Sequence, residues 1–116
     1  MRRLLIHPLS GEAASELVLL NNVASGTSEA VPVSNAYRVA MVAVYDNGVT
    51  AGEVILESAR SKDYAGDWAN EGSSTAGSNK TDRVTADGPM EWVRARIADP
   101  IVDGNVTVYL SAIGEY

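Results

Sequence analysis

The sequence predicts an all-β protein: a single antiparallel β-sandwich, jelly-roll-like, with about eight strands and an extended N-terminal arm. Short segments rich in Val, Ile and Leu recur between turn signals, which is typical of a sandwich or barrel. Many β-branched residues and few long helix formers favour sheet over helix. The 116 residues suit one domain, which we divide into an arm at 1–16 and a sandwich at 17–116.

Four strands are predicted in the first half of the chain. The runs LVLLNNV (17–23) and AVPV (30–33) are short, apolar and joined by a Ser/Gly/Thr link. The run AYRVAMVAVY (36–45) is long enough to cross a sheet. It is followed by Asn47-Gly48, a dipeptide typical of type I′ hairpin turns, and we expect 49–59 to pair with 36–45 across this turn.

The second half predicts four more strands. One surrounds Trp68 and is followed by a polar loop of small residues, GSSTAGSN (72–79). A strand at 82–86 ends at the break Asp87-Gly88-Pro89. The last two strands, 91–98 and 105–113, are joined at Asp103-Gly104 and are expected to form a hairpin.

Side chains alternate between the two faces of a strand, so this last pair predicts two contrasting surfaces. The core face receives Val93, Ala95, Ile97, Val106, Val108, Leu110 and Ala112. The opposite face receives Trp92, Arg94, Arg96 and Tyr109. Arginine and aromatic residues together are enriched at protein–protein contacts, which makes this face a candidate interface. A solvated face with Trp92 under arginine stems, or a ligand-stacking face, remains an alternative.

The first sixteen residues, MRRLLIHPLSGEAASE, contain an apolar run too short for a signal peptide or a membrane span. We expect an extended arm that adds five residues to the candidate interface: Arg2, Arg3, Leu4, Leu5 and Ile6. A helix from Gly11 to Leu20, with Ser10 as its N-cap, is the alternative.

Composition argues against several classes of function. The net charge is −6 and the nine Lys and Arg residues are scattered, so neither nucleic acid nor membrane is an expected partner. There is no cysteine, and His7 is the only histidine, so a zinc or Ser–His site has no obvious assembly. The carboxylates Asp63, Asp67 and Glu71 lack the spacing of a calcium loop. We therefore expect no cofactor, no metal and no enzymatic activity.

Trp68 follows Asp67 in a turn-rich segment, and two roles fit it. It is an aromatic plug at one end of the core or an exposed platform for a sugar. The plug is favoured, and a carbohydrate-binding module that uses Trp68 or Trp92 remains the alternative function.

The order of these segments resembles small β-sandwich virion proteins of tailed bacteriophages. The resemblance covers residues 17–116, and its strongest part is EWVRARI followed by a Gly turn and VTVYLSA. It implies a capsid decoration or cement protein, or a head-fibre or tail component, on the phage particle surface and made in the host cytoplasm. The implied partners are the major capsid protein or another virion protein. A homo-oligomer is expected, with a trimer favoured over a dimer, and the arm at 1–16 departs from the resemblance.

Overall fold

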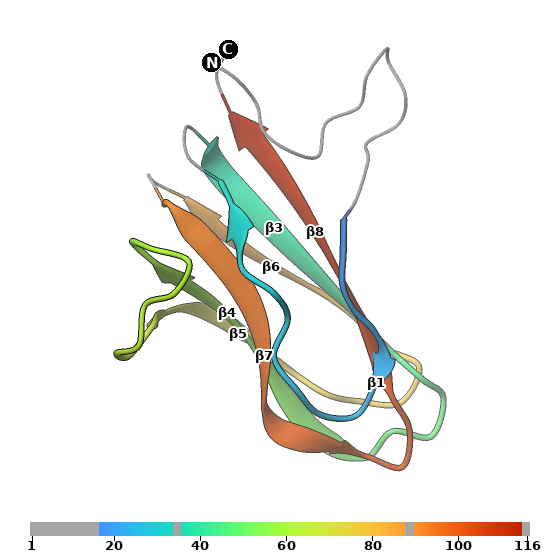
Figure 1. Ribbon diagram of the computed structural model, residues 1–116. Coiled ribbons are helices and arrows are strands. Elements are labelled where there is room, and N and C mark those ends of the chain that lie inside the picture. Colours follow the sequence, from blue (N-terminus) through green and yellow to red (C-terminus); the bar gives the residue numbers. More distant parts are fainter. Residues whose placement is uncertain (1–16, 34–35, 88–89, 115–116) are drawn as a thin grey trace.

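The computed structural model describes residues 17–33, 36–87 and 90–114, which form eight β-strands (Figure 1). The first four are β1 (Leu17–Val23), β2 (Val31–Pro32), β3 (Ala36–Tyr45) and β4 (Ala51–Ala59). The last four are β5 (Ala69–Thr75), β6 (Thr81–Asp87), β7 (Trp92–Val102) and β8 (Val106–Gly114). The predicted arm lies outside the described residues. In the described ranges there is no helix long and apolar enough to cross a membrane.

The strands form two antiparallel sheets that pack face to face. Sheet A has the order β1-β8-β3-β6, and sheet B has the order β2-β7-β4-β5 (Figure 1). Except for the hairpin β4–β5, each connection crosses from one sheet to the other. This is the strand order of a jelly roll, and it confirms the predicted fold class.

Both predicted hairpins are wrong, because in each case the two strands lie in different sheets. Strand β3 pairs with β6 and β8, whereas β4 pairs with β5 and β7. The turn after β3 is closed by the Val49 N–H, which donates to the Asp46 carbonyl at 3.4 Å. Only Gly48 has a positive φ there, at 95°, so the turn is not type I′. It redirects the chain from sheet A to sheet B.

Some strand limits differ from the predictions. The predicted loop 72–79 begins in β5, which runs to Thr75 because its backbone completes the ladder with β4. Strand β7 continues past Ala98 to Val102, with register shifts against β4 near Glu53. Such shifts admit the extra residues around Pro100 without breaking the sheet. Residues 17–20 are strand, so the alternative helix is wrong for that part.

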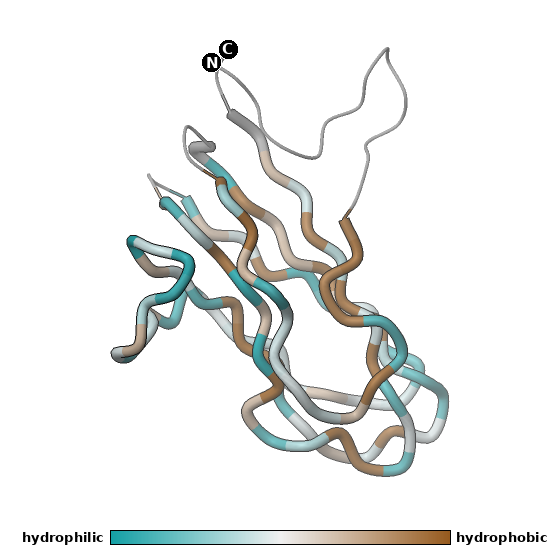
Figure 2. The backbone as a smooth tube through the Cα atoms, in the orientation of Figure 1, coloured by the Kyte–Doolittle hydropathy of each residue, from teal (hydrophilic) through white to brown (hydrophobic). Residues whose placement is uncertain are grey.

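Aliphatic side chains from both sheets fill the space between them. Figure 2 shows that hydrophobic residues are distributed along the strands of both sheets. The predicted core positions of β7 and β8 are buried, namely Val93, Ala95, Ile97, Val106, Val108 and Leu110, and Ala112 packs partly buried against them. Tyr45 is the one aromatic residue of the described core cluster, and its hydroxyl lies 2.7 Å from Ser74 Oγ. Ser74 donates to Asp82 at 2.8 Å, so a polar chain links sheet A to sheet B at this end of the core.

Candidate functional site

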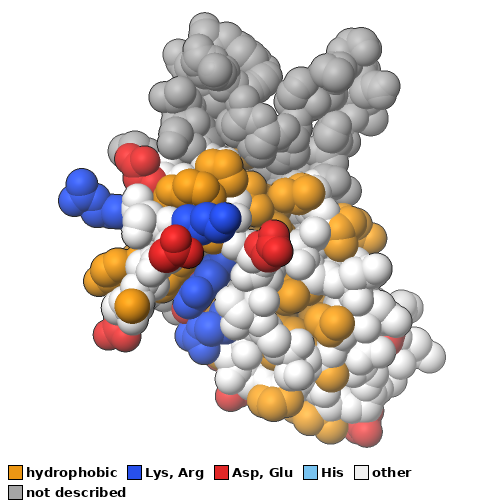
Figure 3. Space-filling view, viewed as in Figure 1, with side chains coloured by type: hydrophobic (Ala, Val, Ile, Leu, Met, Phe, Trp, Pro, Cys, Tyr) orange, Lys and Arg blue, Asp and Glu red, His pale blue; other side chains and the backbone are white. Residues whose placement is uncertain are grey.

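The outer face of sheet B carries a group of charged and aromatic side chains, which we call the Arg–Trp cluster. Its members are Glu57 on β4, Trp68 just before β5, and Trp92, Arg94 and Arg96 on β7. The period-two alternation places the β7 residues on this face because Val93, Ala95 and Ile97 occupy the core. Figure 3 shows lysine and arginine side chains gathered over this part of the surface, with carboxylates and apolar side chains beside them.

Glu57 holds the two arginines of the cluster. Arg94 Nε donates to one carboxylate oxygen of Glu57 at 2.9 Å, and Arg96 Nε donates to the other at 2.8 Å. The Glu57 side chain is only 5% exposed, so this carboxylate is an unusual buried charge that the arginines compensate. Sequence reasoning missed Glu57, because its position opposite Arg94 depends on the pairing of β4 with β7.

Trp68 lies beneath Arg94 rather than in the core. The guanidinium carbon of Arg94 is 4.0 Å from the centroid of the Trp68 ring, a cation–π arrangement. Trp68 is 9% exposed, yet it is outside the cluster of buried side chains between the sheets. The predicted core plug is therefore wrong in location, and an exposed platform is wrong as well, because Arg94 covers the ring.

The indole of Trp68 fixes the loop between β4 and β5. Its Nε1–H donates to the backbone carbonyl of Tyr64 at 3.0 Å, and the Tyr64 N–H donates to the Ser61 carbonyl at 3.3 Å. A chain of contacts therefore runs from buried Glu57 through Arg94 and Trp68 to the loop. The cluster therefore connects the packing of sheet B to the position of the loop after β4.

Tyr109 does not belong to this face. It lies on β8 in sheet A, where it pairs with Val42 and Val18, whereas β7 lies in sheet B. The prediction that Tyr109 shares a surface with Trp92, Arg94 and Arg96 is wrong, since it depended on the hairpin. Arg2, Arg3, Leu4, Leu5 and Ile6 lie outside the described residues, as does His7.

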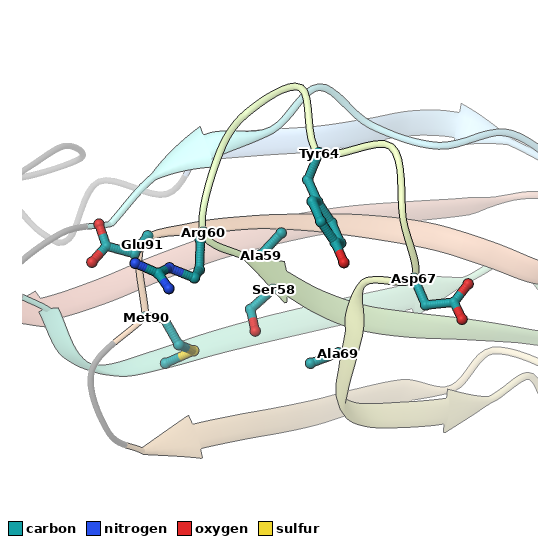
Figure 4. Close-up of a pocket in the computed structure, with 8 residues that line it drawn as sticks. All are labelled: Ser58, Ala59, Arg60, Tyr64, Asp67, Ala69, Met90 and Glu91. Carbon is teal, nitrogen blue, oxygen red and sulfur yellow. The ribbon is translucent and has the colours of Figure 1, made fainter.

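A pocket of about 340 Å³ opens between the end of β4, the loop after it and the residues that precede β7 (Figure 4). Its lining residues are Ser58, Ala59, Arg60, Tyr64, Asp67, Ala69, Met90 and Glu91. Sequence reasoning considered Asp67 only as a calcium ligand and rejected that role on spacing, so it did not anticipate this pocket. Within 17–33, 36–87 and 90–114, no group of three His, Cys, Asp or Glu residues could hold a metal ion. The nearby Glu71 instead accepts a hydrogen bond from Ser58 Oγ at 2.6 Å.

A second hollow, of about 220 Å³, lies at the edge of the sandwich where β1 and the segment before β2 approach each other. It is lined by Leu17, Val18, Leu19, Glu29, Ala30 and Val31. Among the strands that the structure describes, β1 is at the edge of sheet A, and Leu17 and Val18 are 40% and 46% exposed. An edge strand with exposed apolar side chains offers both backbone groups and apolar surface to another chain.

No family model matches the sequence, and no curated protein matches it. Solved structures share the fold. The chain is similar to the SPBc2 prophage-derived protein YomS, with a TM-score of 0.58 and 13% identity over 84% of this chain and 90% of that one. It is also similar to the K2 cleaved adhesin domain of Lys-gingipain, with a TM-score of 0.54 and 14% identity over 92% of this chain and 75% of that one. At these identities the likeness establishes the fold alone, a jelly-roll β-sandwich.

Proposed function

We propose that the protein is a non-enzymatic structural protein of a tailed-phage particle. Its leading role is that of a capsid decoration or cement protein on the virion surface, where it binds the major capsid protein or another virion protein. The resemblance of EWVRARI and VTVYLSA to such proteins supports this proposal. A fold in common with a prophage-derived protein is consistent with it.

The observation that carries the proposal is the exposed apolar surface of β1, which is an edge strand among the described residues. Leu17 and Val18 present apolar surface beside the hollow that reaches Val31. A protein that acts by assembly needs such a surface, since an edge strand offers both backbone hydrogen bonds and side-chain burial to a neighbour. Many weak contacts of this kind, repeated by lattice symmetry, sum to high avidity.

The predicted arm lies directly before β1 in the sequence. Residues 1–16 join the described chain directly at Leu17, and their apolar segment Leu4–Ile6 is flanked by Arg2 and Arg3. We propose a homo-oligomer, a trimer rather than a dimer, in which the β1 edge and the arm contact a neighbouring subunit or the shell. A stable interface of this kind removes about 1,200–2,000 Å² from water in total.

The test compares the full-length protein with two variants. Deletion of residues 1–9 and the substitution Val18→Lys should each leave the sandwich folded but reduce the oligomer mass in light scattering. Both should also weaken co-sedimentation with undecorated capsids. Val102→Lys is the matched control, because Val102 is equally exposed (44%) but lies on β7. A full-length protein that is monomeric and binds no phage particle contradicts the proposal.

A tail or fibre component is distinguished by the same sedimentation assay, with isolated tails in place of capsids.

The carbohydrate-binding alternative that used Trp68 as a platform finds no support, because Arg94 covers that ring. Trp92 is half-buried and pairs with Pro32 and Ala59 along the strands.

A further inference from the structure

The pocket beneath the loop between β4 and β5 has the construction of a small-ligand site. Its volume of about 340 Å³ is at the lower end of the range for ligand pockets. Of its lining residues Met90 and Ser58 are buried, while Tyr64, Arg60, Asp67 and Glu91 are exposed. The site is therefore an apolar depression with an aromatic and charged rim, sized for one small unit rather than a long chain.

The aromatic wall of the pocket is held in place. A Cβ on Gly66 would lie 2.5 Å from Tyr64 Oη and 2.7 Å from Cζ, so the phenol ring lies directly over the glycine. The carbonyl of Tyr64 is fixed by the Trp68 indole, which in turn lies under Arg94. Figure 4 shows the ring of Tyr64 directed from the loop toward the middle of the pocket. A ring held this way loses little entropy when a ligand packs against it.

Charged groups stand at both ends of the pocket. Arg60 and Glu91 lie at one end and Asp67 at the other (Figure 4). None of these three side chains takes part in the ion pairs or side-chain hydrogen bonds found in the described part of the chain. By contrast, Glu57 uses both of its carboxylate oxygens on Arg94 and Arg96 of the neighbouring strand β7. The rim thus retains hydrogen-bonding capacity that a ligand can use.

The chemistry of the lining selects a class of ligand. A carboxylate only accepts hydrogen bonds and a guanidinium only donates them, so the ligand must both donate and accept at neighbouring positions. Hydroxyl groups do both. The aromatic ring and the aliphatic side chains of Ala59, Ala69 and Met90 require an apolar face as well. Two carboxylates and one guanidinium disfavour an anionic ligand, and Arg60 disfavours a cationic one.

We propose that this pocket binds one neutral sugar residue, alone or at the end of a glycan, with Tyr64 against its C–H face. The exposed side chains of Asp67 and Glu91, whose carboxylates are directed outward in Figure 4, turn inward to accept hydrogen bonds from its hydroxyl groups, and Arg60 donates to them. Neither Trp68 nor Trp92 takes part directly. The proposal does not depend on the virion function, because the pocket and the β1 edge use different residues.

The test is a titration of ¹⁵N-labelled full-length protein with six sugars: glucose, galactose, mannose, N-acetylglucosamine, cellobiose and lactose. Each is added to about 10 mM, above the roughly millimolar dissociation constant expected for so small a contact. At least one sugar should shift the amide signals of Ala59, Gly66 and Ala69 in a saturable way. Tyr64→Ala should weaken that binding by at least about tenfold. Gly66→Ala, which keeps the tyrosine but displaces its ring, should weaken it as well.

Tyr109→Ala is the matched control, since it removes a tyrosine from sheet A and should leave the dissociation constant unchanged. The absence of a saturable shift with all six sugars overturns the proposal, as does equal binding by the Tyr64→Ala variant. Shifts at these amides with a lysine-containing tripeptide, and with none of the sugars, assign the pocket to a cationic peptide side chain instead. Light scattering of Tyr64→Ala should match the unmodified protein, so failure here is distinct from failure of the assembly proposal.

Discussion

Arg94 lies over the ring of Trp68, with 4.0 Å between its guanidinium carbon and the ring centroid. The two residues are far apart in the sequence and meet because β7 and the end of the β4–β5 loop share the outer face of sheet B. Buried Glu57 fixes the arginine, and the tryptophan fixes the loop. This contact therefore connects the packing of the sheet to the position of the pocket.

The contact predicts that the Trp68 ring becomes more accessible to solvent when Arg94 is replaced. In a Trp92→Phe background Trp68 is the remaining tryptophan, so its fluorescence is measured alone. Arg94→Ala should increase acrylamide quenching and lower the free energy of unfolding by about 1–2 kcal/mol. For Arg94→Lys, both quenching and the free energy of unfolding should lie between the values for the unsubstituted protein and for Arg94→Ala, because lysine keeps the charge but loses the planar stacking on the ring. Arg83→Ala, an exposed arginine in sheet A, should change neither quantity, and quenching unaffected by Arg94→Ala would contradict the assignment.

The burial of the Glu57 carboxylate predicts that removing its charge destabilises the fold more than removing the charge of an exposed ion pair does. Glu57→Gln removes the charge that both arginines use, and we expect a loss of about 1–3 kcal/mol in the free energy of unfolding by urea. The loss stays moderate because Arg94 and Arg96 reach solvent and can be hydrated there. The control is Asp87→Asn in the Arg38–Asp87 pair, whose side chains are 53% and 70% exposed. That change should cost less than about 1 kcal/mol, and equal losses in the two variants would contradict the burial of Glu57.

Tyr45 predicts a loss of stability in alkali. Burial raises the pKa of its hydroxyl above the ordinary value of 10.0; Asp82 and Glu53 add to this, and the Ser74 hydrogen bond opposes it. As pH rises, the unfolded tyrosine ionises first, so stability is complete below pH 10.0 and falls as pH rises through the folded pKa.

Urea unfolding between about pH 8 and pH 11 measures this effect. Tyr45→Phe should cost about 0.5–1.5 kcal/mol at neutral pH through the lost hydrogen bond, and its stability should then fall less steeply above pH 10.0. If the free energy of unfolding fell equally steeply with pH in the unsubstituted protein and in Tyr45→Phe, Tyr45 would not be the group responsible for the loss of stability in alkali.

Leu110 tests the register of β8. Its side chain is fully buried between the sheets, so Leu110→Ala should lower the free energy of unfolding by about 2–5 kcal/mol. Val102→Ala, at an exposed apolar position of β7, should change it by less than about 0.5 kcal/mol. Thermal or urea denaturation measures both. A small effect at Leu110 would mean that β8 presents its other face to the core.

The sequence by itself determined where most strands lie and which sides of β7 and β8 face inward. The limits of β1 and β3 agree with the predictions, and Val93, Val108 and Leu110 are buried as their alternation required. These features depend on neighbouring residues only, because β propensity, turn residues and period-two patterning all act within a few positions of the chain. No knowledge of strand partners was needed for them.

Only the tertiary structure decided which strands pair. Asn47-Gly48 and Asp103-Gly104 mark chain reversals, but a reversal does not specify whether the next strand joins the same sheet or the facing one. That choice depends on how two complete sheets bury their apolar faces together, which involves contacts between distant residues. The place of Tyr109 in the opposite sheet, the position of Glu57 between two arginines and the pocket beside Tyr64 all follow from it.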